Sequence, residues 1–460
     1  MPSPTPAAVL NWLRLAYAGD VCGGMSGPRP AEATQALQEH PKLADDAFVA
    51  CATGDLAALR TAAAGDPDWP NRPGGPLNLP PLIAVTHSSL VRLPAFRERL
   101  HAATRELLQA GADPNQAIGS RWPPASVDNP SDVHRLSALY GAAGQAHDPE
   151  LTRLLLDAGA DPNDGESLYH SVDSVACTRL LLEGGARVTG SNALYRALDF
   201  DNLEALRILL ENGGDPNEPW PGEAPHECGH PLLWAIRRRR SPANVRALLV
   251  AGADPAVKTA SGASAHALAM RYGLPEVAAL LDAGEPLSES ERFVAACAAG
   301  DEAAARRLLP SETPLESFLS ELQLAMLPEL AALGQGDAVR LMVRLGWPIA
   351  VRGGDWDASA LNHAVFRGDA GLTRFLLAHG ADWREEHGFG DNARGTLSWA
   401  SLNESEPGGD WAGCALALVA HGMPHAQPAP DQPGRVLIDG QPAAFSAAVI
   451  EVLLRPSASD

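Results

Sequence analysis

The sequence predicts an all-α protein built from a repeated pair of helices, and three observations lead to this fold class. The composition is 45% hydrophobic but only 5% aromatic, which favours closely stacked helices over a sheet sandwich. No run of alternating Val, Ile and aromatic residues recurs, so strands are not expected as main elements. The third observation is one helix ending that recurs along the chain, at residues 105–115 (RELLQAGADPN), 153–163 (RLLLDAGADPN), 207–217 (RILLENGGDPN), 246–255 (RALLVAGADP) and 374–382 (RFLLAHGAD).

Each of these segments predicts an amphipathic helix that stops at a glycine. Glycine takes the left-handed conformation past the last helical turn, and the proline of the Asp-Pro turn prevents the helix from continuing. A second recurring unit lies upstream and predicts the start of another helix, because a small polar residue caps it and Ala or Pro opens it. This unit is found at residues 137–143 (SALYGAA), 192–198 (NALYRAL), 230–236 (HPLLWAI) and 359–365 (SALNHAV).

The upstream unit resembles the ankyrin consensus T-P-L-H-x-A-A, which recurs about every 33 residues in that family. A complete unit runs over residues 359–382 as a helix, a Gly-Asp turn, a second helix and a Gly-Ala-Asp stop. The resemblance implies an ankyrin-repeat solenoid of about eleven helix-turn-helix repeats with helical caps and long inter-repeat loops. The repeats are expected to begin near Asp46, Pro80, Ser137, Ser167, Asn192, His230, Ser264, Glu291, Leu327, Ser359 and Gly395.

The strength of the match divides the chain into predicted parts. The two end segments are off-pattern and are expected to be helical caps. Long loops rich in Pro, Gly, Asp and Trp are expected at residues 66–79, 116–135, 218–230 and 385–394. The predicted parts are an N-terminal cap (1–44), ankyrin repeats (45–286), degenerate ankyrin-like repeats (287–350), ankyrin repeats (351–425) and a C-terminal cap (426–460).

The charge and the cysteines limit the partners and the compartment. The formal net charge is −21, which disfavours nucleic acid and anionic membranes and favours a basic partner or simple solubility. The six cysteines include no C-x-x-C pair and lie on apolar stretches, as reduced thiols do. No signal peptide or membrane span is recognisable. We therefore expect a cytoplasmic protein, and the contiguous repeat pattern favours a monomer.

One motif invites a metal-dependent interpretation. His226-Glu-Cys-Gly-His230 matches H-E-x-x-H, the zinc metalloprotease signature, in which both histidines lie on one face of a helix. However, Gly229 lies inside the motif, and the ankyrin-like helix is expected to begin only at His230. His226, Cys228 and His230 remain weak metal candidates, and no cofactor is expected. No phosphate-binding loop and no G-x-S-x-G elbow is present.

The ankyrin resemblance also implies where a partner would bind. In that family the two positions after A-A and the turn tips line the concave groove. Arg beside an aromatic ring suits capture of an acidic group, but a run such as residues 237–240 is equally typical of a solvated helix end neutralised by nearby acids. The positions in this chain include Phe200, Arg237, Arg238, Arg271, Tyr272, Phe366 and Arg367, with Trp220 and Trp356 as turn-tip candidates.

These observations predict a non-catalytic scaffold that binds a protein or peptide, with acidic groups of the partner at the groove. An acidic inhibitor or immunity-type protein that neutralises a basic enzyme is the first alternative. The second alternative is a metal-dependent enzyme that uses the 226–230 loop. A fold argues weakly for any one function, so the three hypotheses stay open at this point.

Overall fold

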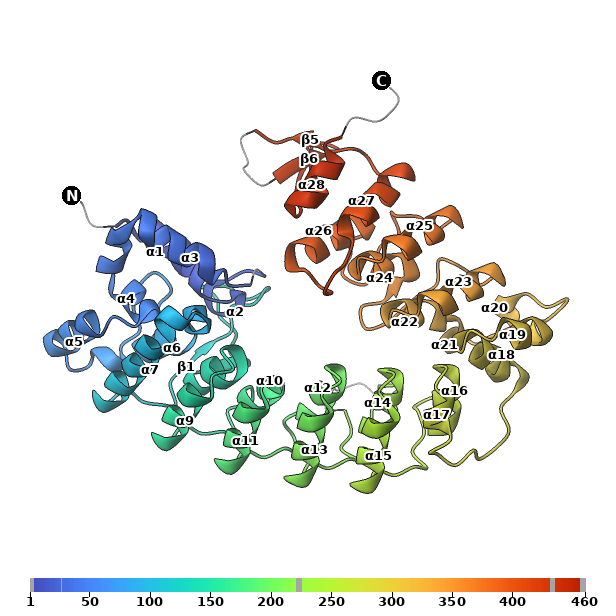
Figure 1. The fold of residues 1–460 in the computed structure, drawn as a ribbon, viewed down its shortest axis with the longest axis horizontal. Coiled ribbons are helices and arrows are strands. Elements are labelled where there is room, and N and C mark those ends of the chain that lie inside the picture. The colour runs from blue at the N-terminus through green and yellow to red at the C-terminus, as the bar shows by residue number, and fades with distance from the viewer. Residues whose placement is uncertain (1–3, 26, 221–225, 431–434, 456–460) are drawn as a thin grey trace. The chain divides into compact units, whose positions relative to one another are not determined.

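The computed structural model describes residues 4–25, 27–220, 226–430 and 435–455. The parts of the predicted end caps and of the 218–230 loop outside these ranges are therefore not described. The chain divides into two compact units, of which the first holds residues 1–234 and 243–254 and the second holds 235–242 and 255–460. Helices make up most of both units, as predicted, and the strands are short (Figure 1).

The first unit begins with a small helical cap and continues as paired helices. In each pair a short first helix packs against the longer helix that follows it, and neighbouring pairs pack side by side. The helices are α1 (Pro6–Ala16), α2 (Gly19–Cys22), α3 (Pro30–Glu39), η1 (Pro41–Asp45), α4 (Ala47–Thr53), α5 (Leu56–Gly65), η2 (Trp69–Asn71), α6 (Pro81–Thr86), η3 (Ser89–Arg92), α7 (Pro94–Gln109), α8 (Ala138–Tyr140), η4 (Gly141–Gln145), α9 (Pro149–Asp157), α10 (Ser167–Ser171), α11 (Val175–Glu183), α12 (Ala193–Asp199) and α13 (Leu203–Glu211), followed by α14 (Pro231–Arg237) and α15 (Pro242–Val250), which both units share.

The second unit also consists of paired helices, including the stretch that matches the consensus weakly, although in several of its pairs the first helix is the longer. Its helices are α16 (Ala265–Arg271), α17 (Pro275–Ala278), α18 (Glu289–Ala298), α19 (Glu302–Leu308), α20 (Leu315–Phe318), α21 (Glu321–Leu324), α22 (Met326–Ala332), α23 (Gly336–Arg344), α24 (Ala360–Phe366), α25 (Ala370–Ala378), α26 (Ala393–Asn403), α27 (Trp411–Ala420) and α28 (Ala447–Leu453). Over the described ranges, a helix starts within two residues of each predicted repeat start. The pairs α18–α19 and α22–α23 occupy residues 287–350, where the Gly-Ala-Asp-Pro turn is missing.

The helix ends follow the local chemistry that the sequence indicated. Ser137 caps α8 by accepting a hydrogen bond from the Tyr140 amide, and Ser359 caps α24 in the same way. Gly159 (φ 90°) follows α9 in the left-handed region, where a residue with a Cβ would be strained. The same stop recurs at Gly346 after α23, although Trp347 replaces the usual alanine there. The pair α22–α23 therefore keeps the helix stop of the consensus repeats although its turn sequence differs.

The asparagine of the Asp-Pro-Asn turn has a role that the sequence comparison did not show. The side-chain NH2 of Asn115 donates to the Gly159 carbonyl (3.1 Å), and its side-chain oxygen accepts from the backbone amide of Asp161 (2.8 Å). Asn217 makes the same two contacts to Gly252 and Asp254. Each asparagine therefore ties one turn to the next turn along the stack.

The strands correct one expectation about the C-terminal cap, which was predicted to be helical. Instead β5, β6 and β7 form an antiparallel sheet before the final helix. Val436 and Ile438 are the buried positions of β6, and Asp439 (φ 52°) and Gly440 (φ 74°) form the two-residue turn that favours a hairpin. The strands are β1 (Ala117–Gly119) paired with β2 (Arg135–Ser137), β3 (Arg352–Gly353) paired with β4 (Ala358–Ser359), and the sheet of β5 (Gln427–Pro428), β6 (Arg435–Ile438) and β7 (Gln441–Ala444).

Candidate functional site

Large apolar side chains from four neighbouring segments of the second unit form one surface, which we call the aromatic surface. Trp356 lies in the turn between β3 and β4, and Phe366 is the last residue of α24. Phe389 lies in the loop before α26, and Trp399 and Leu402 are on α26, which packs against α24 (Figure 1). The two predicted anchors Trp356 and Phe366 are thus brought together.

The rings of the aromatic surface contact one another in sequence. Phe366 stacks on Trp399 with ring centroids 5.6 Å apart and planes 11° apart. On its other side Phe366 lies 5.7 Å from Trp356, which in turn contacts the His387 ring at 4.9 Å. His387 contacts Phe389 at 6.0 Å. The surface is therefore contiguous from the loop to α26.

Part of this surface faces solvent although it is strongly apolar. Phe389 is 81% exposed, Leu402 is 52% exposed and Trp399 is 39% exposed. Trp399 and Leu402 are three residues apart, so they lie on one face of α26. Single exposed apolar residues are ordinary, but a contiguous group of this size is typical of a binding surface.

The backbone around the aromatic surface is held by specific hydrogen bonds. The Gly388 amide donates to the carbonyls of Trp356 and Asp357, both at 3.0 Å, which fixes the loop against the β3–β4 turn. The Ser405 hydroxyl donates to the Phe366 carbonyl at 2.6 Å. His387 is buried below Phe389, and this burial lowers the pKa of His387. The imidazole therefore acts as a neutral packing ring at pH 7.

The predicted anchors Arg271 and Arg367 lie close to acidic side chains of the same unit, whereas the aromatic anchors contact one another. Arg367 donates to Glu406 at 2.7 Å and to the Ala332 carbonyl at 3.1 Å. Arg271 is buried and lies 4.0 Å from Glu291. Tyr272, the other predicted anchor beside it, is also buried. These side chains are packed within the second unit.

Arg237 and Arg238 form an ion-pair network with acids of the same unit. Arg237 lies 3.0 Å from Glu329 and 2.8 Å from Asp355, and Arg238 lies 2.8 Å from the second carboxylate oxygen of Asp355. The Arg237 side chain is 8% exposed. Burial works to raise the pKa of Asp355, but the two guanidinium groups outweigh it and the net pKa is lowered. The interpretation of residues 237–240 as a helix end neutralised by acids fits this geometry.

The first unit places Phe200 beside an arginine that the sequence analysis missed. The Arg196 guanidinium lies 4.7 Å from the Tyr169 ring centroid and 4.5 Å from that of Phe200, so it is stacked between two rings. Its Nη2 is 3.4 Å from the Asp173 carboxylate. Phe200 itself is 55% exposed. Arg196 lies four residues before Phe200, so the two side chains are neighbours on the helix surface. This spacing is the signal in the sequence that could have identified Arg196.

Trp220 does not project from its loop. Its ring stacks on Trp234 at 4.9 Å with planes 20° apart, and it contacts Tyr195 at 5.1 Å. His226 packs against the same rings, and its Nδ1 accepts a hydrogen bond from the Cys228 amide at 3.0 Å. Trp220 therefore folds back over its own helix pair.

The H-E-x-x-H motif does not lie on a helix. Residues 226–230 form a turn, and α14 begins only at Pro231. The two histidines consequently lack the one-face spacing that a zinc protease needs. In the ranges that the structure describes, no group of three His, Cys, Asp or Glu side chains could hold a metal ion.

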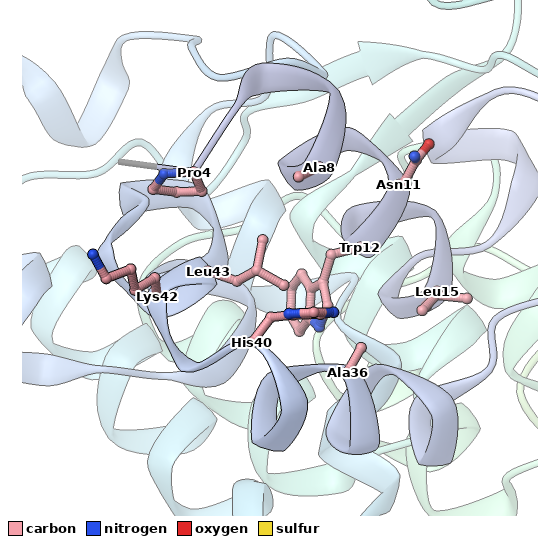
Figure 2. A pocket seen from close by; sticks show the side chains of 9 residues that line it. All are labelled: Pro4, Ala8, Asn11, Trp12, Leu15, Ala36, His40, Lys42 and Leu43. Atoms are coloured by element: carbon pink, nitrogen blue, oxygen red, sulfur yellow. The ribbon is translucent and has the colours of Figure 1, made fainter. Parts of the chain in front are cut away.

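Two hollows lie in the first unit, away from the predicted anchors. One, of about 490 Å³, is formed by α1, α3 and η1, and Figure 2 shows Trp12 at its centre beside Leu43 and His40. The other, of about 520 Å³, lies between α7 and α9 and is lined in part by Arg97, His101 and Asp148. His101 Nε2 and Asp148 are 3.0 Å apart there. The residues that line these two hollows include no Ser, Thr or Cys that could act as a nucleophile. Neither hollow therefore has the arrangement of an acyl-transfer site.

Comparison with known protein families identifies the repeat. The family model of ankyrin repeats (three copies) matches residues 127–219. Over these residues the chain consists of ankyrin repeats. Ankyrin repeats generally mediate contacts between proteins, and ankyrin domains are typically non-catalytic. The ankyrin-repeat sequence matches none of the curated proteins with which it was compared.

Solved ankyrin-repeat domains are also similar to this chain. The human ASB11 ankyrin repeat domain shares 20% identity, over 52% of this chain and 99% of that domain, with a TM-score of 0.38. The ankyrin repeat domain of Bcl-3, a member of the IkappaB protein family, shares 20% identity, over 57% of this chain and 98% of that domain, with a TM-score of 0.25. The fold assignment rests on the family match and the helix pairs. Among the described helices, none has the length and hydrophobicity needed to cross a bilayer.

Proposed function

We propose that this ankyrin-repeat protein is a non-catalytic scaffold that binds a protein or peptide on the aromatic surface. The observation that carries the proposal is the series of ring contacts that joins Trp399, Phe366, Trp356, His387 and Phe389, with Leu402 beside Trp399 on one face of α26. Phe389, Trp399 and Leu402 are exposed, and they come from the loop before α26 and from α26 itself. The groove positions predicted by the resemblance to ankyrin repeats include Phe366, which lies at the centre of this set.

The energetics of protein interfaces support such a role. A few aromatic anchors commonly supply most of the binding free energy, and truncating one such anchor costs about 2 kcal/mol or more, roughly a thirtyfold loss of affinity. The Trp399 ring is already positioned by its stack on Phe366, so little conformational entropy is lost when a partner covers it. Phe200 on the first unit is a second anchor of the same kind, supported below by Arg196.

The other two hypotheses receive different support. The inhibitor hypothesis rests on the net charge of −21 and requires a basic partner. The same negative charge favours a neutral or basic protein over a nucleic acid as the partner. The metal-dependent hypothesis has no geometric support at residues 226–230, because His226 packs on Trp220 and the motif lies in a turn. We therefore prefer the scaffold.

We further infer that the protein works in the cytoplasm as a monomer. All six cysteines are free and buried, which suits a reducing compartment. Helix pairs that stack on their neighbours along one chain bury their apolar faces without a second copy.

Site-specific photo-crosslinking tests the scaffold hypothesis. A photoreactive phenylalanine analogue replaces Leu402 in one variant and Leu416 in another, since Leu416 on α27 is similarly exposed (49%) but lies outside the aromatic surface. We expect a discrete crosslinked protein at position 402 in a lysate of the native organism, lost when Trp399 is also changed to Ala. Equal crosslinking at both positions, or crosslinking that ignores Trp399→Ala, would contradict the proposal.

A further inference from the structure

The arginines that were expected to capture an acidic partner already have acidic partners within the chain. Arg237 and Arg238 share Asp355, and Arg367 binds Glu406. The carboxylate of a partner would have to displace one of these internal acids and leave it unpaired. Such an exchange removes one ion pair for each one formed, so an acidic partner gains little at these positions.

The rim of the aromatic surface has the opposite charge. Glu386 and Asp391 flank Phe389 in the loop, and Glu404 follows Leu402 at the end of α26. All three are exposed, and none lies within ion-pair distance of a basic side chain in the described parts of the chain. Arg394, at the start of the helix, is the one basic residue of α26. The local excess of acid agrees with the net charge of the whole chain, −21.

The chain itself shows how its rings receive a cation. The Arg384 guanidinium lies 4.4 Å from the Trp383 ring centroid, and Arg196 lies 4.5 Å from that of Phe200. A cation over an aromatic face is stabilised by the ring quadrupole, and the stabilisation grows when the partner excludes water. Exposed rings with an acidic rim are thus complementary to basic side chains as well as to apolar ones.

We propose that the partner of the aromatic surface is a cationic amphipathic segment, in which Lys or Arg residues flank apolar side chains. This inference rests on the proposed function and adds the charge of the partner. The apolar side chains cover Phe366, Trp399 and Leu402, while the basic side chains meet the acidic rim. The negative charge of the chain also speeds the approach of such a segment, and salt weakens that attraction.

Two synthetic peptides of equal length test the charge of the partner. The first is an amphipathic helix with Lys on one face and Leu and Trp on the other. The second replaces every Lys with Glu. Their binding to the full chain is measured by fluorescence anisotropy at about 50 mM and about 300 mM NaCl, where the screening length differs roughly twofold. The variants are Trp399→Ala/Leu402→Ala and Glu386→Gln/Glu404→Gln. The matched controls are Leu416→Ala and Glu312→Gln/Glu316→Gln, which change exposed residues elsewhere in the same unit.

The expected result is binding of the Lys peptide only, weakened by salt. Trp399→Ala/Leu402→Ala removes this binding, and Glu386→Gln/Glu404→Gln weakens it roughly threefold to thirtyfold, as two rim ion pairs would. The controls bind as the wild type does. Equal binding of both peptides, lost in Trp399→Ala/Leu402→Ala, overturns the charge inference and leaves the scaffold hypothesis standing. Binding that Trp399→Ala/Leu402→Ala does not affect overturns both the charge inference and the scaffold hypothesis. If neither peptide binds, the charge inference is overturned, and the crosslinking at position 402 then decides the scaffold hypothesis.

Discussion

Replacing Arg237 should destabilise the second unit rather than merely weaken binding. The Arg237 side chain is 8% exposed and lies 3.0 Å from Glu329, whose side chain is 16% exposed, and 2.8 Å from Asp355. Arg237→Ala leaves Glu329 buried without this partner, whereas Asp355 keeps Arg238 at 2.8 Å. Breaking a buried ion pair from one side costs about 3–5 kcal/mol. Since Asp355 keeps Arg238 as a partner, we expect Arg237→Ala to lower the free energy of unfolding by about 2–4 kcal/mol.

Arg238→Ala is the matched control for this prediction. The Arg238 side chain is more exposed (21%), and its removal leaves Asp355 paired with Arg237. Its expected cost is about 1 kcal/mol or less. Urea denaturation followed by circular dichroism measures both, and the unfolding midpoint should fall clearly for Arg237→Ala and slightly for Arg238→Ala. A wild-type midpoint for Arg237→Ala, or a larger effect of Arg238→Ala, would refute the account of this network.

Three further predictions follow from other contacts. Asn115→Ala should lower the stability of the first unit by about 1–2 kcal/mol, because two hydrogen bonds to the next turn are lost; an unchanged urea midpoint would contradict the bridging role. The pKa of Asp355 is lowered in the folded chain, so its stabilising contribution is present above the unfolded pKa of about 3.9 and is lost as the pH falls below that value. The stability of Asp355→Asn should therefore depend less on pH in that range than that of the wild type, and parallel curves would disprove the assignment. Burial raises the pKa of Cys297 and Cys414 to about 12, so neither thiol should react with a disulfide reagent in the native chain at about pH 8, and labelling of either before unfolding would contradict this burial.

The sequence predicted the features of the fold that depend on neighbouring residues. Capping by Ser137 and the stop at Gly159 each depend on the chemistry of a single turn, so a local pattern was enough to predict them. The hairpin at Asp439 and Gly440 was also local, but it was missed because the off-pattern end segments were expected to be helical caps. Its Asp-Gly pair directly after the apolar run Val436-Leu437-Ile438 was the available signal.

The candidate site was only partly predictable, because its contacts join distant positions. The repeat frame selected Phe366, which contacts Trp356 and Trp399 in the structure, but Trp399 and Phe389 lie outside the consensus positions and were not selected. The sequence left two interpretations of Arg237 open, an anchor or part of a helix end neutralised by acids. Its partner Glu329 is 92 residues away, and no local pattern pairs the two. Charge pairing across repeats therefore needed the structure.

Fluorine NMR of the chain labelled with fluorotryptophan tests most directly whether the aromatic surface is the binding site. The chain has ten tryptophans, and Trp399→Phe assigns the resonance of that ring. The buried rings of Trp12 and Trp347 serve as internal controls. The account predicts that the Lys-containing amphipathic peptide shifts the Trp399 resonance and leaves the two buried ones unchanged. Binding of the peptide without any change at Trp399 would contradict it.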